Sequence, residues 1–249
     1  MPVKRTEQLL EIVNQRKKIN VSELAQLLNV SKVTVRKDLT LLEQHGLLQR
    51  KHGFAIINNP DDLNYRLAQN YDTKRQIAVK AANLVHDNET IMIESGSTCA
   101  LLAEELGKQG KHVTIVTISY FIANYVEKFA NLDIFLLGGK YQANSQVVVG
   151  PLTKKALVDF HVAKLFIGTD GFDPKQGFFG NDIMRTDTVQ AMAANAEQLI
   201  ILTDSSKFSG PSLIRQFTLD EVSRVITDNQ LPAATTTLLE QRQINVEKI

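Results

Sequence analysis

The spacing of apolar and polar positions in the first quarter of the chain predicts three short helices followed by a hairpin. An apolar stripe at helical spacing runs along residues 4–16, and a second helix opens at Asn20, which stands in capping-box spacing with Glu23. A third helix begins at Ser31, a good N-cap, and is expected to end at Gly46. Its apolar stripe consists of Val35, Leu39 and Leu42. This order of helix, short turn and helix is typical of a helix-turn-helix.

The polar side of the third helix carries cations and hydroxyl groups: Ser31, Lys32, Thr34, Arg36, Lys37 and Thr40. The DNA major groove admits such a helix, since Arg pairs with guanine and Lys and Thr reach phosphates or base edges. Standing alone, the helix would be explained more readily by a solvated charged face. Strand-like runs at 47–50 and 54–57 flank a tight turn and predict a wing, which brings Arg50, Lys51 and His52 beside the third helix. Together these elements predict a DNA-binding winged helix over residues 1–57.

The rest of the chain alternates strand-like and helical stretches. Residues 58–71 are polar, contain Pro60 and have a weak helical pattern, which favours a linker. Short apolar runs, mostly β-branched, predict strands at 90–94, 113–117, 133–137, 164–167 and 199–203. Helical patterns cover 72–85, 98–108, 120–129, 151–159 and 188–196. The alternation predicts an α/β domain over residues 72–249, with a mainly parallel sheet covered on both faces.

Small and polar residues follow the predicted strands, at the edge where parallel α/β sheets bind ligands. The loops contain Ser95-Gly96-Ser97-Thr98, Thr117 and Ser119, Gly138-Gly139-Lys140, Gly168-Thr169-Asp170-Gly171, and Asp204-Ser205-Ser206-Lys207. Taken singly, each loop is explained by what tight turns require. Their convergence on one edge instead favours a small anionic, polyhydroxylated ligand, with a phosphate at the helix start after Gly96. Lys74 and Arg75 stand in the first turn of a helix, where cations oppose the dipole, so they are either solvated or face an anion.

Charge and composition narrow the class of protein. The net charge of +1 conceals a balance of +5 in residues 1–53 and of −4 in the remainder, which suits a DNA-contacting small domain and an acidic larger one. Cys99 is the single cysteine, so no intrachain disulfide can form, and we interpret it as a small buried residue in preference to a catalytic thiol. There is no signal-like apolar region at the start and no run of the ~20 apolar residues that span a bilayer, so we expect a soluble, cytoplasmic protein.

These motifs resemble the DeoR/GlpR family of bacterial sugar-metabolism repressors over nearly the whole chain. In the first part the matching residues are Val30-Ser31, Thr34-Val35-Arg36-Lys37-Asp38-Leu39, Leu42-Glu43, Gly46 and Arg50-x-His52-Gly53. In the second part they are Lys74-Arg75, Gly96-Ser97-Thr98, Thr117-x-Ser119, Gly138-Gly139, Gly150, Gly168-x-Asp170-Gly171 and Asp204-Ser205-Ser206-Lys207-Phe208. The resemblance implies a sensor domain related to ribose-5-phosphate isomerase and CoA transferases, with a phosphorylated sugar or a related metabolite as inducer.

The chain departs from the family pattern at several positions. Phe54 replaces a second wing glycine, Glu94 stands where Asp is usual, and Ile118 stands where Asn is usual. Residues 180–190 replace a stretch that often carries Glu and Lys, and in it Arg185 and Asp187 are candidate substitutes. The loops that would cradle a phosphate are retained, whereas the parts that would contact the sugar are altered.

The leading hypothesis is a transcriptional regulator, more specifically a repressor, that binds operator DNA as a dimer or tetramer and is released by a sugar phosphate. The phosphate is expected between the start of the helix after Gly96 and Lys207. One alternative is an isomerase-like or CoA-transferase-like enzyme with a fused DNA-binding domain, for which Glu94, Asp170 and Asp204 offer carboxylates but no assignable catalytic motif. The other is a DNA-binding protein with a vestigial, ligand-free sensor. We predict no catalytic residue, no cofactor and no metal site.

Overall fold

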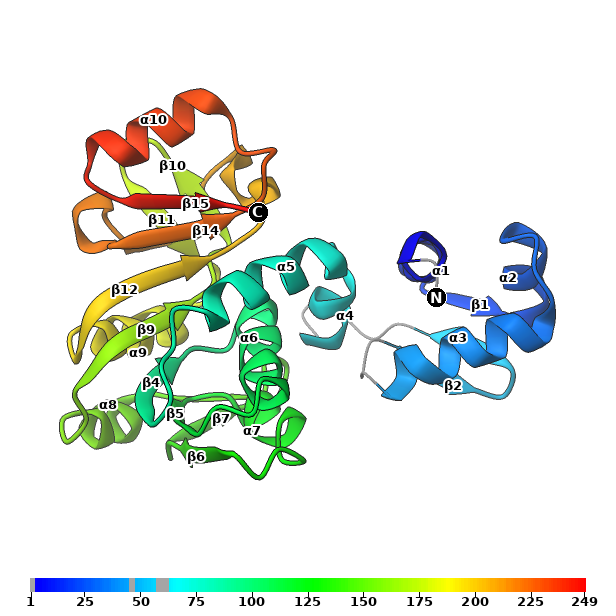
Figure 1. Ribbon diagram of the computed structural model, residues 1–249, viewed down its shortest axis with the longest axis horizontal. Helices are drawn as coiled ribbons and strands as arrows, with labels where there is room; N and C mark the ends of the chain where they lie inside the picture. Colours follow the sequence, from blue (N-terminus) through cyan, green and yellow to red (C-terminus); the bar gives the residue numbers. More distant parts are fainter. Residues whose placement is uncertain (1–2, 45–47, 57–62) are drawn as a thin grey trace. The chain divides into compact units, whose positions relative to one another are not determined.

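The computed structural model describes residues 3–44, 48–56 and 63–249, and the chain divides into two compact units, Met1–Asp72 and Thr73–Ile249. The elements of the first unit are α1 (Val3–Arg16), β1 (Lys18–Asn20), α2 (Val21–Leu27), α3 (Lys32–Gln44), β2 (Gln49–Lys51), β3 (Phe54–Ile56) and α4 (Leu63–Ala68) (Figure 1). Apolar side chains of three helices form its core: Leu9, Leu10, Val13, Leu24, Val35, Leu39 and Leu42. The three helices and the hairpin predicted from the apolar spacing are therefore present. Gly46, the predicted end of α3, lies outside the described residues.

Side-chain caps place the starts of α2 and α3. The Asn20 side chain accepts a hydrogen bond from the Ser22 amide at 2.8 Å, and the Ser31 hydroxyl accepts one from the Thr34 amide at 3.1 Å. Each cap satisfies an amide that the first helical turn leaves without a partner. The predicted caps were thus correct. The Asn20 side chain, however, accepts from the Ser22 amide and not from the Glu23 amide, which a capping box would use.

The wing is a small antiparallel sheet in the order β1-β3-β2. His52 and Gly53 connect β2 to β3 with φ of 50° and 81°, which fits the two-residue turn that joins twisted strands. The Gly53 carbonyl accepts a hydrogen bond from the Val21 amide at 3.0 Å, so the turn is tied to the start of α2. β1 was missed from the sequence because three residues between two helices carry no readable period. Lys51, predicted in the turn, ends β2.

The second unit is built on a seven-stranded sheet in the order β15-β14-β12-β9-β4-β5-β6, in which every neighbouring pair is parallel. The strands are β4 (Glu89–Ile93), β5 (Val113–Thr117), β6 (Leu132–Leu136), β9 (Val162–Ile167), β12 (Ala196–Leu202), β14 (Arg224–Thr227) and β15 (Asn245–Lys248). The predicted α/β class with a mainly parallel sheet is confirmed. β14 and β15 were not predicted.

The direction of the crossovers assigns the helices to the two faces of the sheet. The helices are α5 (Tyr71–Ala82), α6 (Ser97–Lys108), α7 (Tyr120–Tyr125), α8 (Pro151–Leu157), α9 (Ile183–Ala193) and α10 (Ala233–Gln241). The chain steps from β4 to β6 in one direction and from β9 to β15 in the other. Because parallel crossovers are right-handed, α6 and α7 cover one face while α8, α9 and α10 cover the opposite face. Consistent with this, α6 packs against α7 and α8 against α9.

Short elements complete the second unit, and all but η2, which leads into the amino end of β14, follow the carboxyl ends of strands of the large sheet. They are the hairpin β7 (Lys140–Gln142) and β8 (Val147–Val149), the antiparallel sheet of β10 (Gly171–Asp173), β11 (Gly177–Gly180) and β13 (Ile214–Phe217), and the 3-10 turns η1 (Ser205–Ser209) and η2 (Leu219–Glu221). None of these was predicted. α9 begins at Ile183, five residues before the predicted 188, because the Asp182 carboxylate caps it by accepting from the Arg185 amide at 2.7 Å.

Candidate functional site

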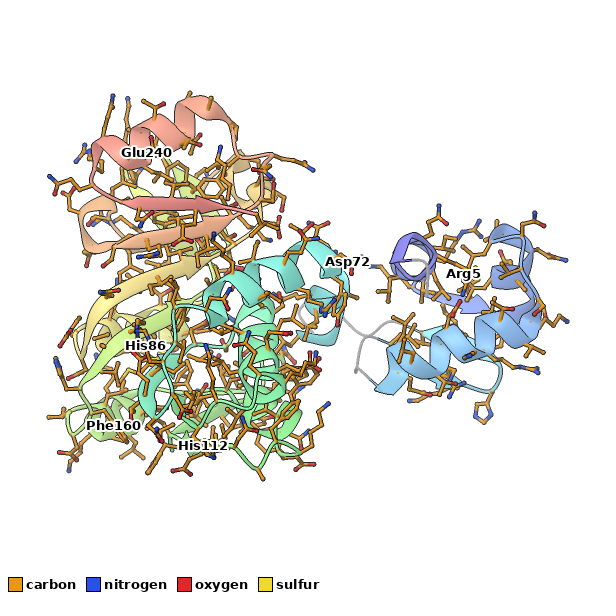
Figure 2. The ribbon with its side chains drawn as sticks, viewed as in Figure 1. Arg5, Asp72, His86, His112, Phe160 and Glu240 are labelled. Carbon is orange, nitrogen blue, oxygen red and sulfur yellow. The ribbon has the colours of Figure 1, made fainter. Side chains whose placement is uncertain are left out.

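The inner side of α3 fixes its orientation within the first unit. Leu39 is fully buried on this side, and the buried Asp38 carboxylate accepts hydrogen bonds from Arg5 of α1, at 2.7 Å from Nε and 3.1 Å from Nη2 (Figure 2). The hydrogen bond to Asp38 raises the pKa of Arg5. Desolvation acts in the opposite direction, and the negative charge of Asp38 adds to the increase. α3 therefore presents a defined outer face.

The outer face of α3 is mostly cationic. Lys32, Arg36 and Lys37 are exposed, as the sequence predicts. Val33 is 73% exposed, and with 3.6 residues per turn it lies beside Lys37 on the side opposite the buried Val35. Sequence reasoning passed over Val33, although an apolar side chain out of phase with the buried stripe was a readable signal. The outer face thus combines cations with one aliphatic group.

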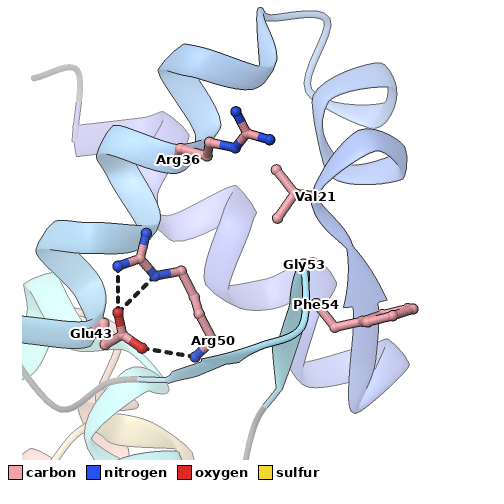
Figure 3. Close-up of a pocket in the computed structure, with 6 residues that line it drawn as sticks. All are labelled: Val21, Arg36, Glu43, Arg50, Gly53 and Phe54. Carbon is pink, nitrogen blue, oxygen red and sulfur yellow. Dashed lines mark hydrogen bonds and ion pairs between the residues drawn. The ribbon is translucent and has the colours of Figure 1, made fainter.

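The wing meets α3 through Arg50. Its amide and Nε donate to the Glu43 carboxylate at 2.9 and 2.7 Å, and its Nη1 donates to the Thr40 hydroxyl at 2.9 Å (Figure 3). Thr40 in turn donates to the Arg36 carbonyl at 2.8 Å. Arg50 and Thr40, both predicted to contact DNA, are thus bonded within the unit. Lys51 and His52 at the wing tip are exposed.

A hollow of about 270 Å³ separates α3 from the wing (Figure 3). Its lining residues are Val21, Arg36, Glu43, Arg50, Gly53 and Phe54. The Arg36 side chain extends across this hollow towards Val21, so the α3 cation and the wing share one surface. Such a surface suits contact with a DNA backbone on either side of a groove.

In the second unit, the reversal of strand order lies between β4 and β9. The loops that follow these two strands touch: a β-carbon built on Gly96 would lie 3.4 Å from the Gly168 Cα. Ligands of open α/β sheets bind outside the carboxyl ends of the strands at such a reversal. Two of the predicted loops therefore meet at the position where a ligand is expected.

The start of α6 lies in one of these loops. Ser95, Ser97 and Thr98 are buried, and none of the described side chains caps the helix after Gly96. By contrast, α7 is capped by Ser119, whose hydroxyl accepts from the Ile122 amide at 3.1 Å, and η1 is capped by Asp204. An uncapped helix start offers amide donors and a positive dipole end to an anion.

A buried ionic cluster lies beside the α6 start. Arg185 Nη2 donates to Asp170 at 3.2 Å and also to the Asn181 side chain, and Arg185 Nε lies 3.8 Å from Glu94. The Ser95 hydroxyl donates to Glu94 at 2.6 Å. Arg185, a candidate substitute from the sequence, thus joins two of the loops. Asp187, the other candidate, is half-exposed and pairs with Lys154 at 2.8 Å, away from the cluster's contacts.

The other predicted effector residues have diverse settings. Thr117 and Ser119 are buried, and the Thr117 hydroxyl donates to the Glu94 carbonyl at 3.3 Å while it accepts from the Ser119 amide at 3.1 Å. Gly138 and Gly139 are exposed and pack on Thr153, whose hydroxyl donates to the Gly138 carbonyl at 2.8 Å. Of the remaining cations, Lys74 is buried, Arg75 is exposed and Lys207 is half-buried.

Neither a metal site nor a membrane span is found in the part of the chain that the structure describes. No group of three or more His, Cys, Asp or Glu side chains there is placed to hold a metal ion. No helix among residues 3–44, 48–56 and 63–249 is long and apolar enough to cross a bilayer. Cys99 is buried, and its thiol lies 3.6 Å from the Phe166 carbonyl.

Comparison with known proteins covers both units. A family model described as "DeoR-like helix-turn-helix domain" matches residues 5–61, and one described as "DeoR C terminal sensor domain" matches residues 69–229. The chain is 30% identical over 237 residues to the HTH-type transcriptional regulator GolR of Listeria innocua, covering 94% of this chain and 93% of the relative. It is 32% identical over 247 residues to the L-fucose operon activator of Haemophilus influenzae, covering 96% and 97%.

Further similarities extend to a repressor and to an enzyme of known structure. The lactose phosphotransferase system repressor of Streptococcus mutans is 31% identical over 236 residues, covering 91% of this chain and 92% of the relative. Ribose 5-phosphate isomerase A from Neisseria gonorrhoeae aligns with 56% of this chain and 54% of its own, at 22% identity and a TM-score of 0.40, from which nothing about function follows. With both of its units matched, the chain belongs to the DeoR family of DNA-binding transcriptional regulators.

Proposed function

We propose that the chain represses genes of carbohydrate metabolism, binds operator DNA through α3 and the wing, and is released by a phosphorylated sugar. The DNA-binding part of the proposal rests on the outer face of α3. Lys32, Arg36 and Lys37 are exposed there, whereas the apolar stripe on the inner side of the helix is fully buried. Relatives that are named for lactose and L-fucose systems support carbohydrate metabolism as the regulated process. In this proposal residues 1–57 read DNA, 58–71 connect, and 72–249 sense and associate.

The DNA contacts are tested with operator fragments selected from a random pool and titrated by fluorescence anisotropy. Arg36→Ala should lose about 1–3 kcal/mol of binding free energy and relax the preference at one base pair. Lys37→Ala should weaken all sequences alike and lower the slope of log K against log salt by about 0.9, as expected for one lost phosphate contact. A variant at Arg36 that selects the same operator as tightly as the wild type would contradict the role of α3.

The sensing half of the proposal rests on the α6 start. Its uncapped amides donate to the phosphate, and Lys207 is carried by η1, which follows β12, a strand ~10 Å from β4. The phosphate would lie between the α6 start and Lys207, with the carboxylates of Glu94 and Asp170 available to the hydroxyl groups of the sugar. Lys74 or Arg75 would supply further positive charge.

Gel shifts titrated with a panel of sugar phosphates test the sensing half. Lys207→Ala should retain operator affinity near that of the wild type but lose release by the active metabolite. Lys175→Ala, which removes an exposed lysine elsewhere in the same unit, should respond like the wild type. Should Lys207→Ala be released at the wild-type metabolite concentration, the phosphate is held elsewhere. Wild-type protein that no phosphorylated sugar releases would support the vestigial sensor instead.

The operator is expected to contain paired half-sites bound by a dimer or a higher even oligomer. A single winged helix touches too little DNA for tight specific binding, and two-fold symmetry doubles the contact. Exposed apolar side chains of the second unit offer an association surface: Phe135, Leu136, Leu152 and Val158. Sedimentation at micromolar concentration should give an even oligomer. A monomer that binds a single half-site tightly would contradict the proposal.

An enzymatic function is not part of the proposal. Glu94 and Asp170 are both paired with Arg185, which disfavours either carboxylate as a general base. The relatives named above are regulators. The similarity to ribose 5-phosphate isomerase covers 56% of this chain at a TM-score of 0.40 and says nothing about activity.

A further inference from the structure

We infer that Arg50 is a positioning residue of the DNA-binding surface, not a phosphate contact. Together with Glu43 and Thr40 it forms a wing latch, a set of hydrogen bonds that fixes strand β2 against α3. The inference rests on the proposed DNA-binding function of the first unit. It adds a distinction within the wing between Arg50, which holds the wing against α3, and the exposed residues, which contact DNA.

The contacts of the latch use most of the Arg50 guanidinium. Nε donates to Glu43 at 2.7 Å, Nη2 lies 2.6 Å from the same carboxylate, and Nη1 donates to the Thr40 hydroxyl at 2.9 Å (Figure 3). Thr40 and Glu43 are three residues apart, so they project from the same side of α3. Nε and Nη2 both meet the same Glu43 oxygen, Oε2, and hydrogen bonds between ionised groups are about twice as strong as those between neutral groups. Three of the five N–H groups of the guanidinium are thus committed to Glu43 and Thr40, which leaves two for a phosphate.

The backbone takes part as well. The Arg50 amide donates to the other Glu43 oxygen at 2.9 Å, so the carboxylate holds the strand itself and not only its side chain. Burial alone would raise the pKa of Glu43, but the hydrogen bonds from the Arg50 side chain and amide, with the Arg50 charge, outweigh it and lower the pKa. The carboxylate is therefore ionised at neutral pH and committed to the wing.

The latch has a counterpart at the tip of the wing. There the Gly53 carbonyl accepts from the Val21 amide at 3.0 Å. The wing is thus held at its base by α3 and at its tip by the start of α2, while Lys51 and His52 between these points stay exposed. This arrangement fixes the stretch of backbone that carries the exposed Lys51 side chain.

The two roles for Arg50 predict opposite results at Glu43. If Arg50 bound a phosphate, Glu43 would be a competing negative charge about one-third exposed at the DNA surface, and neutralising it would tighten binding. If Arg50 is part of a latch, neutralising Glu43 frees the wing and weakens binding. The sign of the change separates the two roles without reference to its size.

The experiment uses the full-length protein and its selected operator, with anisotropy titrations between 50 and 200 mM salt for Glu43→Gln, Arg50→Ala, the double variant and the control Lys51→Ala. We expect Glu43→Gln and Arg50→Ala each to weaken binding about threefold to tenfold with the wild-type salt slope, and the double variant to be no weaker than either. Lys51→Ala, next to Arg50 but exposed, should lower the slope by about 0.9.

Tighter binding by Glu43→Gln, or a salt slope lowered by about 0.9 in Arg50→Ala, would overturn the latch. If Arg50→Ala unfolds the unit, Thr40→Val tests the latch instead, because it removes one hydrogen bond while keeping the shape of the side chain. A weaker complex with an unchanged salt slope would support the latch, and wild-type affinity would contradict it. Failure of the proposed function is distinguishable, because the wild-type protein would then select no operator.

Discussion

Val33 is expected to read a thymine methyl group in the operator. It is 73% exposed on the outer face of α3, next to the cations that would hold the duplex. The thymine C5-methyl is the apolar feature of the major groove, and aliphatic side chains are its usual partners. Replacing Val33 by alanine should therefore remove a preference for thymine over a base that lacks only the methyl group.

The size of the effect follows from the area that the contact removes from water. Burying one methyl-sized group is worth ~0.8 kcal/mol, about a fourfold change in affinity. A symmetric dimer makes the contact in both half-sites, so the paired effect is about 1.6 kcal/mol, or roughly 15-fold. An effect of this size is well within the resolution of a binding titration.

The assay replaces each operator thymine in turn by deoxyuridine, which removes the methyl group and leaves the hydrogen-bonding edge intact. Wild-type protein should lose about fourfold at one position per half-site, and Val33→Ala should show no loss there. Leu213→Ala, at a similarly exposed apolar residue of the second unit, serves as the control and should keep the wild-type pattern. If no thymine distinguishes wild type from Val33→Ala, the outward valine is not in the groove and the reasoning fails.

Three further outcomes are expected. Leu39→Ala leaves a cavity at a fully buried position and should lower the stability of the first unit by about 2–5 kcal/mol. In calorimetry the transition temperature of the first unit should fall by roughly 10–30 °C while that of the second unit is unchanged. A shift of both transitions together would contradict two separate units. Arg185→Met leaves Glu94 and Asp170 without their shared cation, so the second unit should lose about 3–5 kcal/mol of stability in thermal melts; a variant as stable as the wild type would be evidence against the cluster. Because the pKa of Glu43 is lowered on folding, the stability it contributes is present above the ordinary carboxylate pKa and lost as pH falls through the folded value; the gap in melting temperature between wild type and Arg50→Ala should therefore narrow as the pH falls, and a gap unchanged in acid would exclude an ionised Glu43.

Local patterns predicted the elements that are long enough to show a period. α3 was predicted from its cap and its apolar stripe, and β5 was predicted with its observed bounds, Val113–Thr117. β1 has three residues, and β14 and β15 have four each, too few to show alternation above chance. These strands form because a neighbouring strand offers hydrogen bonds, which is a property of the folded sheet.

The candidate sites divide in the same way. Exposed cations on α3 could be predicted because their position follows from the helical period alone. The bonds of Arg50 to Glu43 could not, since arginine in a wing is equally suited to a phosphate or a carboxylate and only the folded hairpin brings the two together. Likewise the contact of Arg185 with Asp170 and Glu94 depends on the first turn of α9 and two loops that meet at the sheet edge.

The open start of α6 has a consequence for the amount of protein as well as for its DNA affinity. A ligand that binds there binds the folded second unit alone, so at one hundred times its dissociation constant it would stabilise that unit by about 2.7 kcal/mol. Unfolded molecules are the ones that cells degrade, and a difference of this size changes abundance several-fold. A metabolite that takes the protein off DNA would thereby lengthen its lifetime, and regulator would accumulate for rapid return to the operator once the metabolite is consumed.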